Sequence, residues 1–127
     1  MEQRAHRYFF LKEERLSSKK SIKELFSKGS SFFVYPFKVI YFSGTTPVTQ
    51  VLFTVPKKSF KKAVDRNLIR RRVKEAYRLN KHIILPDQEK SLSLSIAFIY
   101  VAKDILPYKQ IETKLKKCLL RLSQVYQ

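Results

Sequence analysis

The sequence has very little of what several common kinds of functional site require. Its 127 residues include two glycines, one cysteine and two histidines, and no tryptophan. Two glycines leave little room for a glycine-rich phosphate-binding loop, and the sequence contains none. The lone cysteine, Cys118, excludes an intrachain disulfide and fits a reducing compartment, so we expect a cytoplasmic protein.

Catalytic and metal-binding patterns are also missing. His6 and His82 lie far apart in the sequence, and neither has a second cysteine or an acidic cluster nearby at ligand spacing. Cys118 recurs with Ile111 and Leu115 at helical spacing, which favours a small buried thiol over a nucleophile. If the chain serves an enzyme, we therefore expect it to carry no catalytic residue and no metal site of its own.

Long apolar runs are absent as well. The first residues contain only the run YFFL, whereas a signal peptide needs about 7 to 15 apolar residues. No stretch approaches the roughly 20 apolar residues of a membrane span. We therefore expect neither export nor insertion into a membrane.

What the sequence has in excess is positive charge. It contains 27 lysines and arginines against 10 acidic residues, a formal net charge of +17. Solubility does not require such a charge, and the charge increases self-repulsion in the folded state. A polyanionic partner compensates for this repulsion, which favours a nucleic acid first and an anionic membrane surface second.

The chain is expected to form a single domain of the α+β class. Residues 1–16 are charged without a clean period, so they are predicted to be a basic N-terminal tail before a domain over 17–127. The apolar periodicity predicts a helix over 17–29, strands over 30–44 (with a break at Pro36) and 50–58, a helix over 62–81, a strand over 92–103 and a helix over 104–124.

One strand is apolar on both of its faces. In FKVIYF, residues 37–42, Phe37 and Val39 point to one face, whereas Lys38 and Ile40 point to the other. Helices that cover both faces of the sheet would explain this pattern. A partly open cleft, whose aromatic floor stacks on unpaired bases, would explain it as well.

The helix predicted over 62–81 is amphipathic, and its polar side is almost purely cationic. At about 100° per residue, Ile69, Val73 and Ala76 fall on one side, and Leu68 and Leu79 flank them. The other side is an arc of about 140° that holds Arg66, Asn67, Arg70, Arg71, Lys74, Arg78 and Lys81.

Like charges follow one another along this arc instead of alternating in sign. Arg66, Arg70 and Lys74 are spaced four residues apart, where each like pair costs a few tenths of a kcal/mol. Residues 57–81 contain eleven cations and two acids, a net +9 of the total +17. Such a concentration, dominated by arginine, indicates contact with a phosphate backbone.

The stretch FKKAVDRNLIRRRVKEAYR, preceded by FTVPKK, resembles the signature of the bacterial ribonuclease P protein component. The matching positions are Phe60, Ala63, Arg66, Asn67, Ile69, Arg70, Arg71, Val73 and Lys74. The likeness continues into the first helix and the last strand and helix, and covers roughly residues 14–122 in order. The sequence departs from many members at Lys61, where they have glycine, and at Ile22, where they have phenylalanine.

The resemblance implies a fold and a function. The fold is a single αβββαβα domain with a four-stranded mixed sheet and a left-handed βαβ crossover, similar to one domain of a small-subunit ribosomal protein. In the family, a large RNA that uses bound Mg²⁺ is the catalyst, and the protein helps it to remove the 5′ leader of precursor tRNA. We expect a monomeric protein that forms a 1:1 complex with this RNA.

The resemblance also implies site residues, and of these we expect Arg66 and Arg70 to be contact residues rather than core residues. The catalytic-RNA-binding positions are Arg66, Asn67, Arg70, Arg71 and Lys74, with Arg78 added from the helical wheel alone. The positions that bind the precursor tRNA leader are Ile22, Phe26, Lys38, Ile40, Lys57 and Lys58, the last two at the rim of the cleft. For Phe26, plain core packing is an equal alternative.

Two other classes of protein are compatible with the charge pattern. One is a ribosome-associated RNA-binding protein without a catalytic role, and the other is a basic-helix DNA binder. Base readout usually places Asn, Gln or Arg among smaller residues and often requires a dimer, which argues against DNA.

Overall fold

The protein folds into a four-stranded sheet with helices on both faces. The computed structural model describes residues 14–43, 49–84 and 94–125. In chain order its elements are α2 (Lys19–Lys28), β1 (Ser30–Val34), β2 (Phe37–Ser43), β3 (Gln50–Thr54), α3 (Ala63–Asn80), the short 3₁₀ helix η2 (Lys81–Ile83), β4 (Leu94–Tyr100) and α4 (Tyr108–Val125). None of the helices in these ranges is long and apolar enough to cross a membrane.

The strands lie in the order β1-β2-β4-β3. The pairs β1/β2 and β2/β4 are antiparallel, whereas β3 and β4 are parallel and are connected through α3. The sheet is therefore mixed, and the αβββαβα order is confirmed. The strand predicted over 92–103 is β4, which lies inside the sheet with a neighbour on each side.

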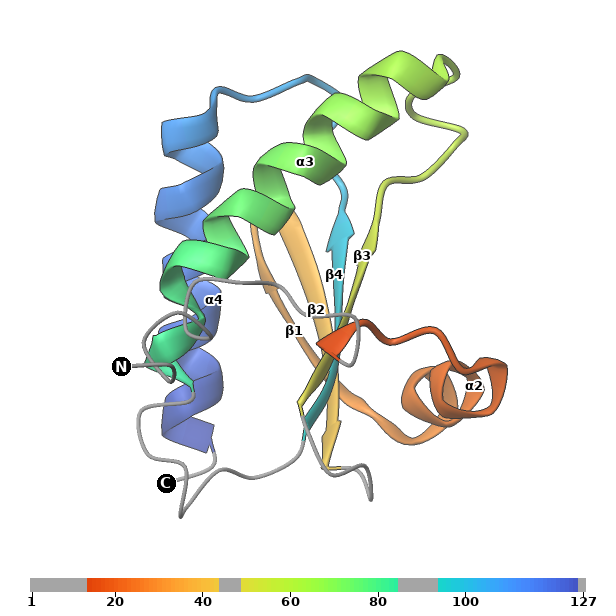
Figure 1. Ribbon diagram of the computed structural model, residues 1–127, viewed down its shortest axis with the longest axis vertical. Helices are drawn as coiled ribbons and strands as arrows, with labels where there is room; N and C mark the ends of the chain where they lie inside the picture. Colours follow the sequence, from red (N-terminus) through yellow and green to blue (C-terminus); the bar gives the residue numbers. More distant parts are fainter. Residues whose placement is uncertain (1–13, 44–48, 85–93, 126–127) are drawn as a thin grey trace.

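The two faces of the sheet are covered unequally. α3 and α4 lie side by side on one face, and the shorter α2 lies on the other (Figure 1). The larger core cluster joins one face of the sheet to α3 and α4, and the smaller cluster lies between the other face and α2. Both faces of β2 are therefore partly covered, which explains why both carry apolar residues.

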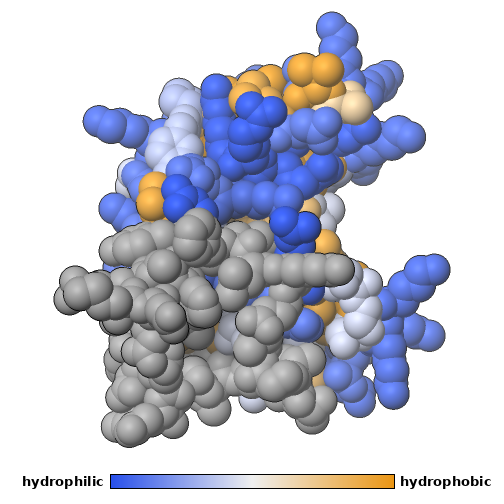
Figure 2. All heavy atoms as spheres, viewed as in Figure 1, coloured by the Kyte–Doolittle hydropathy of each residue, from blue (hydrophilic) through white to orange (hydrophobic). Residues whose placement is uncertain are grey.

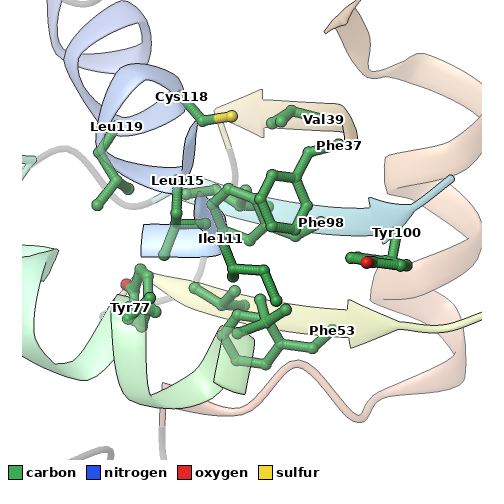
Figure 3. Packing of buried hydrophobic residues seen from close by; sticks show 14 of the residues in the cluster. Phe37, Val39, Phe53, Tyr77, Phe98, Tyr100, Ile111, Leu115, Cys118 and Leu119 are labelled. Carbon is green, nitrogen blue, oxygen red and sulfur yellow. The ribbon is translucent and has the colours of Figure 1, made fainter. Parts of the chain in front are cut away.

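Aromatic side chains from neighbouring strands fill the larger core (Figure 3). The rings of Phe53 and Phe98 stack at 5.8 Å, and Phe37 meets Phe98 edge-on at 6.1 Å. Cys118 belongs to this core, and burial raises the pKa of its thiol to about 12. The prediction that Cys118 is a small buried thiol is confirmed.

Local capping sets the limits of α2 where the sequence predicts them. The Ser18 hydroxyl accepts a hydrogen bond from the amide of Ser21 at 3.3 Å, which caps the first turn. At the other end, the amide of Gly29 donates to the carbonyl of Leu25 at 2.8 Å. A Cβ at Gly29 would collide with that same carbonyl oxygen, so the end of the helix requires glycine.

The folded part of the chain begins earlier than residue 17. Glu14 and Leu16 are buried, and Arg15 between them pairs in parallel with Val51 at the free edge of β3. Glu14 forms an ion pair with Lys81, with 2.8 Å between the carboxylate oxygen and Nζ. Lys81 is only 4% exposed, so the expectation that it is a surface cation of the arc is wrong: it is buried in an ion pair with a carboxylate far away in the sequence.

We expect Glu14→Ala to lower the free energy of unfolding by roughly 3 to 5 kcal/mol, because it removes one partner of a buried ion pair and leaves the other charge buried. Urea denaturation measures this loss. The control is Glu24→Ala, which breaks an exposed pair with Lys28 at 3.8 Å and should cost at most about 1 kcal/mol. Equal losses for the two variants would show that the buried ion pair of Glu14 with Lys81 contributes no more to stability than the exposed pair does.

Candidate RNA-binding surfaces

The orientation of α3 agrees with its sequence pattern. Ile69, Val73 and Ala76 are buried as predicted, and Tyr77 and Asn80 are buried beside them. Hydrophilic side chains gather over α3 on the opposite side (Figure 2). Asn67 and Arg71 are exposed there, and the other predicted contact residues, Arg66, Arg70, Lys74 and Arg78, are partly exposed. We call this set of six residues the α3 face.

Arg66 differs from the rest of the α3 face because it also stabilises the loop before the helix. Its Nη1 donates to the carbonyl oxygens of Phe60 at 2.7 Å and Lys61 at 2.9 Å. The N-cap of α3, Lys62, makes no side-chain capping bond, so the loop is held by these two bonds to its carbonyls and not by a cap on the helix N–H groups. Arg66 thus holds in place a loop that carries four exposed lysines: Lys57, Lys58, Lys61 and Lys62.

Arg70 and Arg78 also have partners within the protein. Arg70 Nη1 donates to Oδ1 of Asn67 at 3.1 Å, so Asn67 orients a guanidinium of the α3 face. Arg78 forms a two-point ion pair with Glu75, at 2.9 and 2.7 Å, and these hydrogen bonds raise the pKa of Arg78. Because Glu75 compensates its charge, Arg78 contributes less to the field of the α3 face than Arg71 does.

The second candidate surface is the sheet face under α2. The strand register aligns Phe33, Lys38, Ile99 and Thr54 in one row across the sheet. Phe33 is 57% exposed, and Lys38 is exposed beside it. We call this row, together with Phe26, the open sheet face.

The predicted leader-binding residues differ in how exposed they are on this surface. Phe26 is 48% exposed, so the alternative that it is a core residue is wrong. Ile40 is buried in the cluster under α2, against which Ile22 packs partly buried, so of the two strand positions only Lys38 is open to a ligand. Phe33 was missed, although the alternation in SSFFV could have placed it opposite the buried Phe32.

The loop before α3 lies near this surface. Figure 2 shows a hollow between α2 and the chain that leads into α3. Lys57 and Lys58 are exposed in that chain segment. Cations, exposed aromatic rings and a concave surface therefore occur on one side of the molecule, as single-strand binding requires.

Within the described part of the chain, no group of three or more His, Cys, Asp or Glu residues could hold a metal ion. The buried ion pair uses Glu14, and Glu75 and Glu112 are engaged with Arg78 and Asn80. We therefore derive no chemical step through a metal bound by these residues.

These surfaces define the class of protein: an α+β domain with a cationic helix on one face of its sheet and exposed aromatic rings on the other, a combination suited to binding RNA. Comparison with known proteins agrees. The Ribonuclease P family pattern matches residues 10–123. The chain belongs to the ribonuclease P protein family.

Curated relatives and solved structures support this membership. A ribonuclease P protein component from Porphyromonas gingivalis is 37% identical over 116 residues, which cover 88% of this chain and 85% of the relative. One from Petrotoga mobilis is 31% identical, over 89% of this chain and 94% of the relative. The solved ribonuclease P protein of Staphylococcus aureus has a TM-score of 0.70 at 25% identity, with 90% of this chain and 98% of that chain covered. The protein from Thermotoga maritima has the same TM-score and identity, with coverages of 85% and 96%.

We expect Arg66→Ala to destabilise the protein, contrary to the expectation of a pure contact residue. It removes hydrogen bonds from a charged group to two carbonyls, and such bonds contribute about 1.5 to 3 kcal/mol. Arg71→Ala, the matched exposed arginine, should stay within about ±0.5 kcal/mol. Thermal and urea unfolding of both variants compares them. If Arg66→Ala were as neutral as Arg71→Ala, the loop would not depend on this guanidinium.

Proposed function

We propose that this chain acts as the protein subunit of ribonuclease P by binding two RNA segments on opposite sides of its sheet. The α3 face binds the catalytic RNA, and the open sheet face binds the 5′ leader of precursor tRNA. The observation that carries the proposal is the combination of a cationic helix on one side of the sheet with exposed Phe26, Phe33 and Lys38 on the other. We further propose a monomeric protein in a 1:1 complex with the RNA, in the cytoplasm.

The charges and side chains of the described residues indicate which tasks belong to the protein and which to the RNA. The α3 face supplies fixed positive charge, and arginine forks suit phosphate oxygens in two-point contacts. The described residues offer no metal-binding group, so we assign the Mg²⁺ that supports leader removal mainly to the RNA subunit. The protein's own contribution is to dock on the RNA and to position the leader.

Leader binding requires tolerance of sequence, because leaders differ from one precursor to another. Aromatic stacking meets this requirement since every base has a π-face, and it contributes about 1 to 3 kcal/mol per base. Phe26 and Phe33 are exposed rings that can stack, and Lys38, which lies opposite Phe33 on the neighbouring strand, can contact a phosphate. Ile40 supports this surface from beneath.

A ribosome-associated RNA-binding protein would also need a cationic surface to bind RNA, but no observation favours this alternative. Relatives that span most of the chain are named as ribonuclease P protein components. Reconstitution with a ribonuclease P RNA separates the two functions. The proposed function requires that the protein stimulate 5′ processing of precursor tRNA at low Mg²⁺, and no stimulation would contradict it.

Affinity for the catalytic RNA should depend steeply on salt. If about five or six phosphates are neutralised, log K should fall against log salt with a slope of roughly −3.5 to −5.5, because each contact contributes about −0.7 to −0.9. Filter binding or fluorescence titration over a series of salt concentrations measures the slope. A slope near −1 would rule out the α3 face as the main docking surface.

Substitutions on the open sheet face should act on the leader alone. Phe26→Ala, Phe33→Ala and Lys38→Ala should each reduce the preference of the reconstituted enzyme for precursor over mature tRNA, for the rings by about 5- to 150-fold if each stacks on one base. Affinity for mature tRNA should not change. Lys116→Ala, an exposed lysine on α4, is the matched control for Lys38→Ala. Equal weakening of both tRNAs would show that the leader binds elsewhere.

A further inference from the structure

Arg15 lies on the surface between two buried anchors. Glu14 before it forms the ion pair with Lys81, and the amide of Leu16 after it donates to the carbonyl of Val51 at 3.0 Å. Leu16 itself packs in the cluster under α2. The backbone of Arg15 is therefore fixed from both sides, although its side chain is exposed.

The pairing with Val51 decides which face of the sheet Arg15 points to. Residues that lie opposite each other on neighbouring strands point to the same face, and consecutive residues point to opposite faces. Val51 belongs to the core that α3 and α4 cover, whereas Leu16 faces α2. The side chain of Arg15 therefore points to the α3 side of the sheet, at its β3 edge.

The flank of α3 at this edge carries two cations of the α3 face. Arg70, Lys74 and Lys81 follow one another at four and seven residues, so they form one stripe along the helix. Glu14 contacts Lys81 at the end of this stripe, which brings the next residue, Arg15, alongside it. Lys81 is buried in its ion pair with Glu14, whereas Arg15 adds an exposed charge beside the same stripe.

The electrostatics agree with this placement. The pKa of Lys74 is lowered, chiefly by burial, then by the charge of Arg15 and then by that of Arg70. Across the described ranges, no ion pair joins Arg70 or Lys74 to an acidic residue. Arg15 and Arg70 therefore each repel Lys74, and an anion beside Lys74 would relieve that repulsion.

We propose that Arg15, Arg70 and Lys74 form one binding site for a phosphodiester group of the catalytic RNA. The site rests on the proposed function and extends the α3 face onto the edge of the sheet. It lies on the side of the sheet opposite Lys38 and Phe33, so its ligand belongs to the catalytic RNA and not to the leader. The ion pair of Glu14 with Lys81 acts as a positioning device for Arg15.

The test is the affinity of Arg15→Gln for the catalytic RNA, without substrate, over a series of salt concentrations. We expect the affinity to fall by about tenfold or more, the equivalent of a lost hydrogen bond to a charged group. The salt slope should become shallower by about 0.7 to 0.9, which a purely structural role would not change. Arg15→Lys should restore most of the slope, because it keeps the charge. Circular dichroism and thermal unfolding confirm that both variants fold.

Two further variants separate the possible outcomes. Lys116→Gln removes one exposed charge from α4 and controls for the loss of net charge alone. Arg70→Gln tests the α3 face itself. If Arg15→Gln behaves like Lys116→Gln while Arg70→Gln weakens binding, this site is overturned and the proposed function stands. If neither Arg15→Gln nor Arg70→Gln weakens binding, the docking face fails together with the site. If Arg15→Gln weakens only precursor tRNA binding by the assembled enzyme, the assignment to the catalytic RNA is overturned.

Discussion

The rest of the structure depends on how the core fixes the rotation of α3 about its axis. Ile69 and Val73 are buried against the sheet, and Tyr77 packs edge-on against Phe53, which stacks on Phe98. A turn by one residue, about 100°, would bring arginines into this aromatic core. A buried charge without a partner costs several kcal/mol, so the helix has one stable orientation. The packing of the core thereby decides which side chains face the RNA.

The unequal covering of the sheet creates the second surface. α3 and α4, of 18 residues each, cover one face, whereas α2, of 10 residues, covers only part of the other. The row of Phe33, Lys38 and Ile99 stays partly exposed as a result. The short helix leaves apolar and aromatic surface available for stacking.

Much of this arrangement was predictable from the sequence, and the exceptions have one cause. Periodicity identified the order of elements, the buried side of α3 and the buried Cys118, because these depend on neighbours a few residues away. Lys81 looked like a surface cation because its partner, Glu14, lies 67 residues earlier. Ile40 was overrated because α2, a separate segment of the chain, packs over it. Contacts between distant segments set these exposures, and no local pattern records them.

The same contacts divide the cations of this protein between folding and binding. Arg72 donates to the carbonyl of Leu106 at 2.7 Å, Arg66 holds the loop before α3, and Glu75 and Glu14 hold Arg78 and Lys81. These cations stabilise the fold, and they are less available to a phosphate than Arg70, Arg71 or Lys74. The net charge of +17 therefore overstates the number of RNA contacts. The net positive charge attracts a polyanion from a distance. The fold determines which few cations remain exposed and able to bind its phosphates.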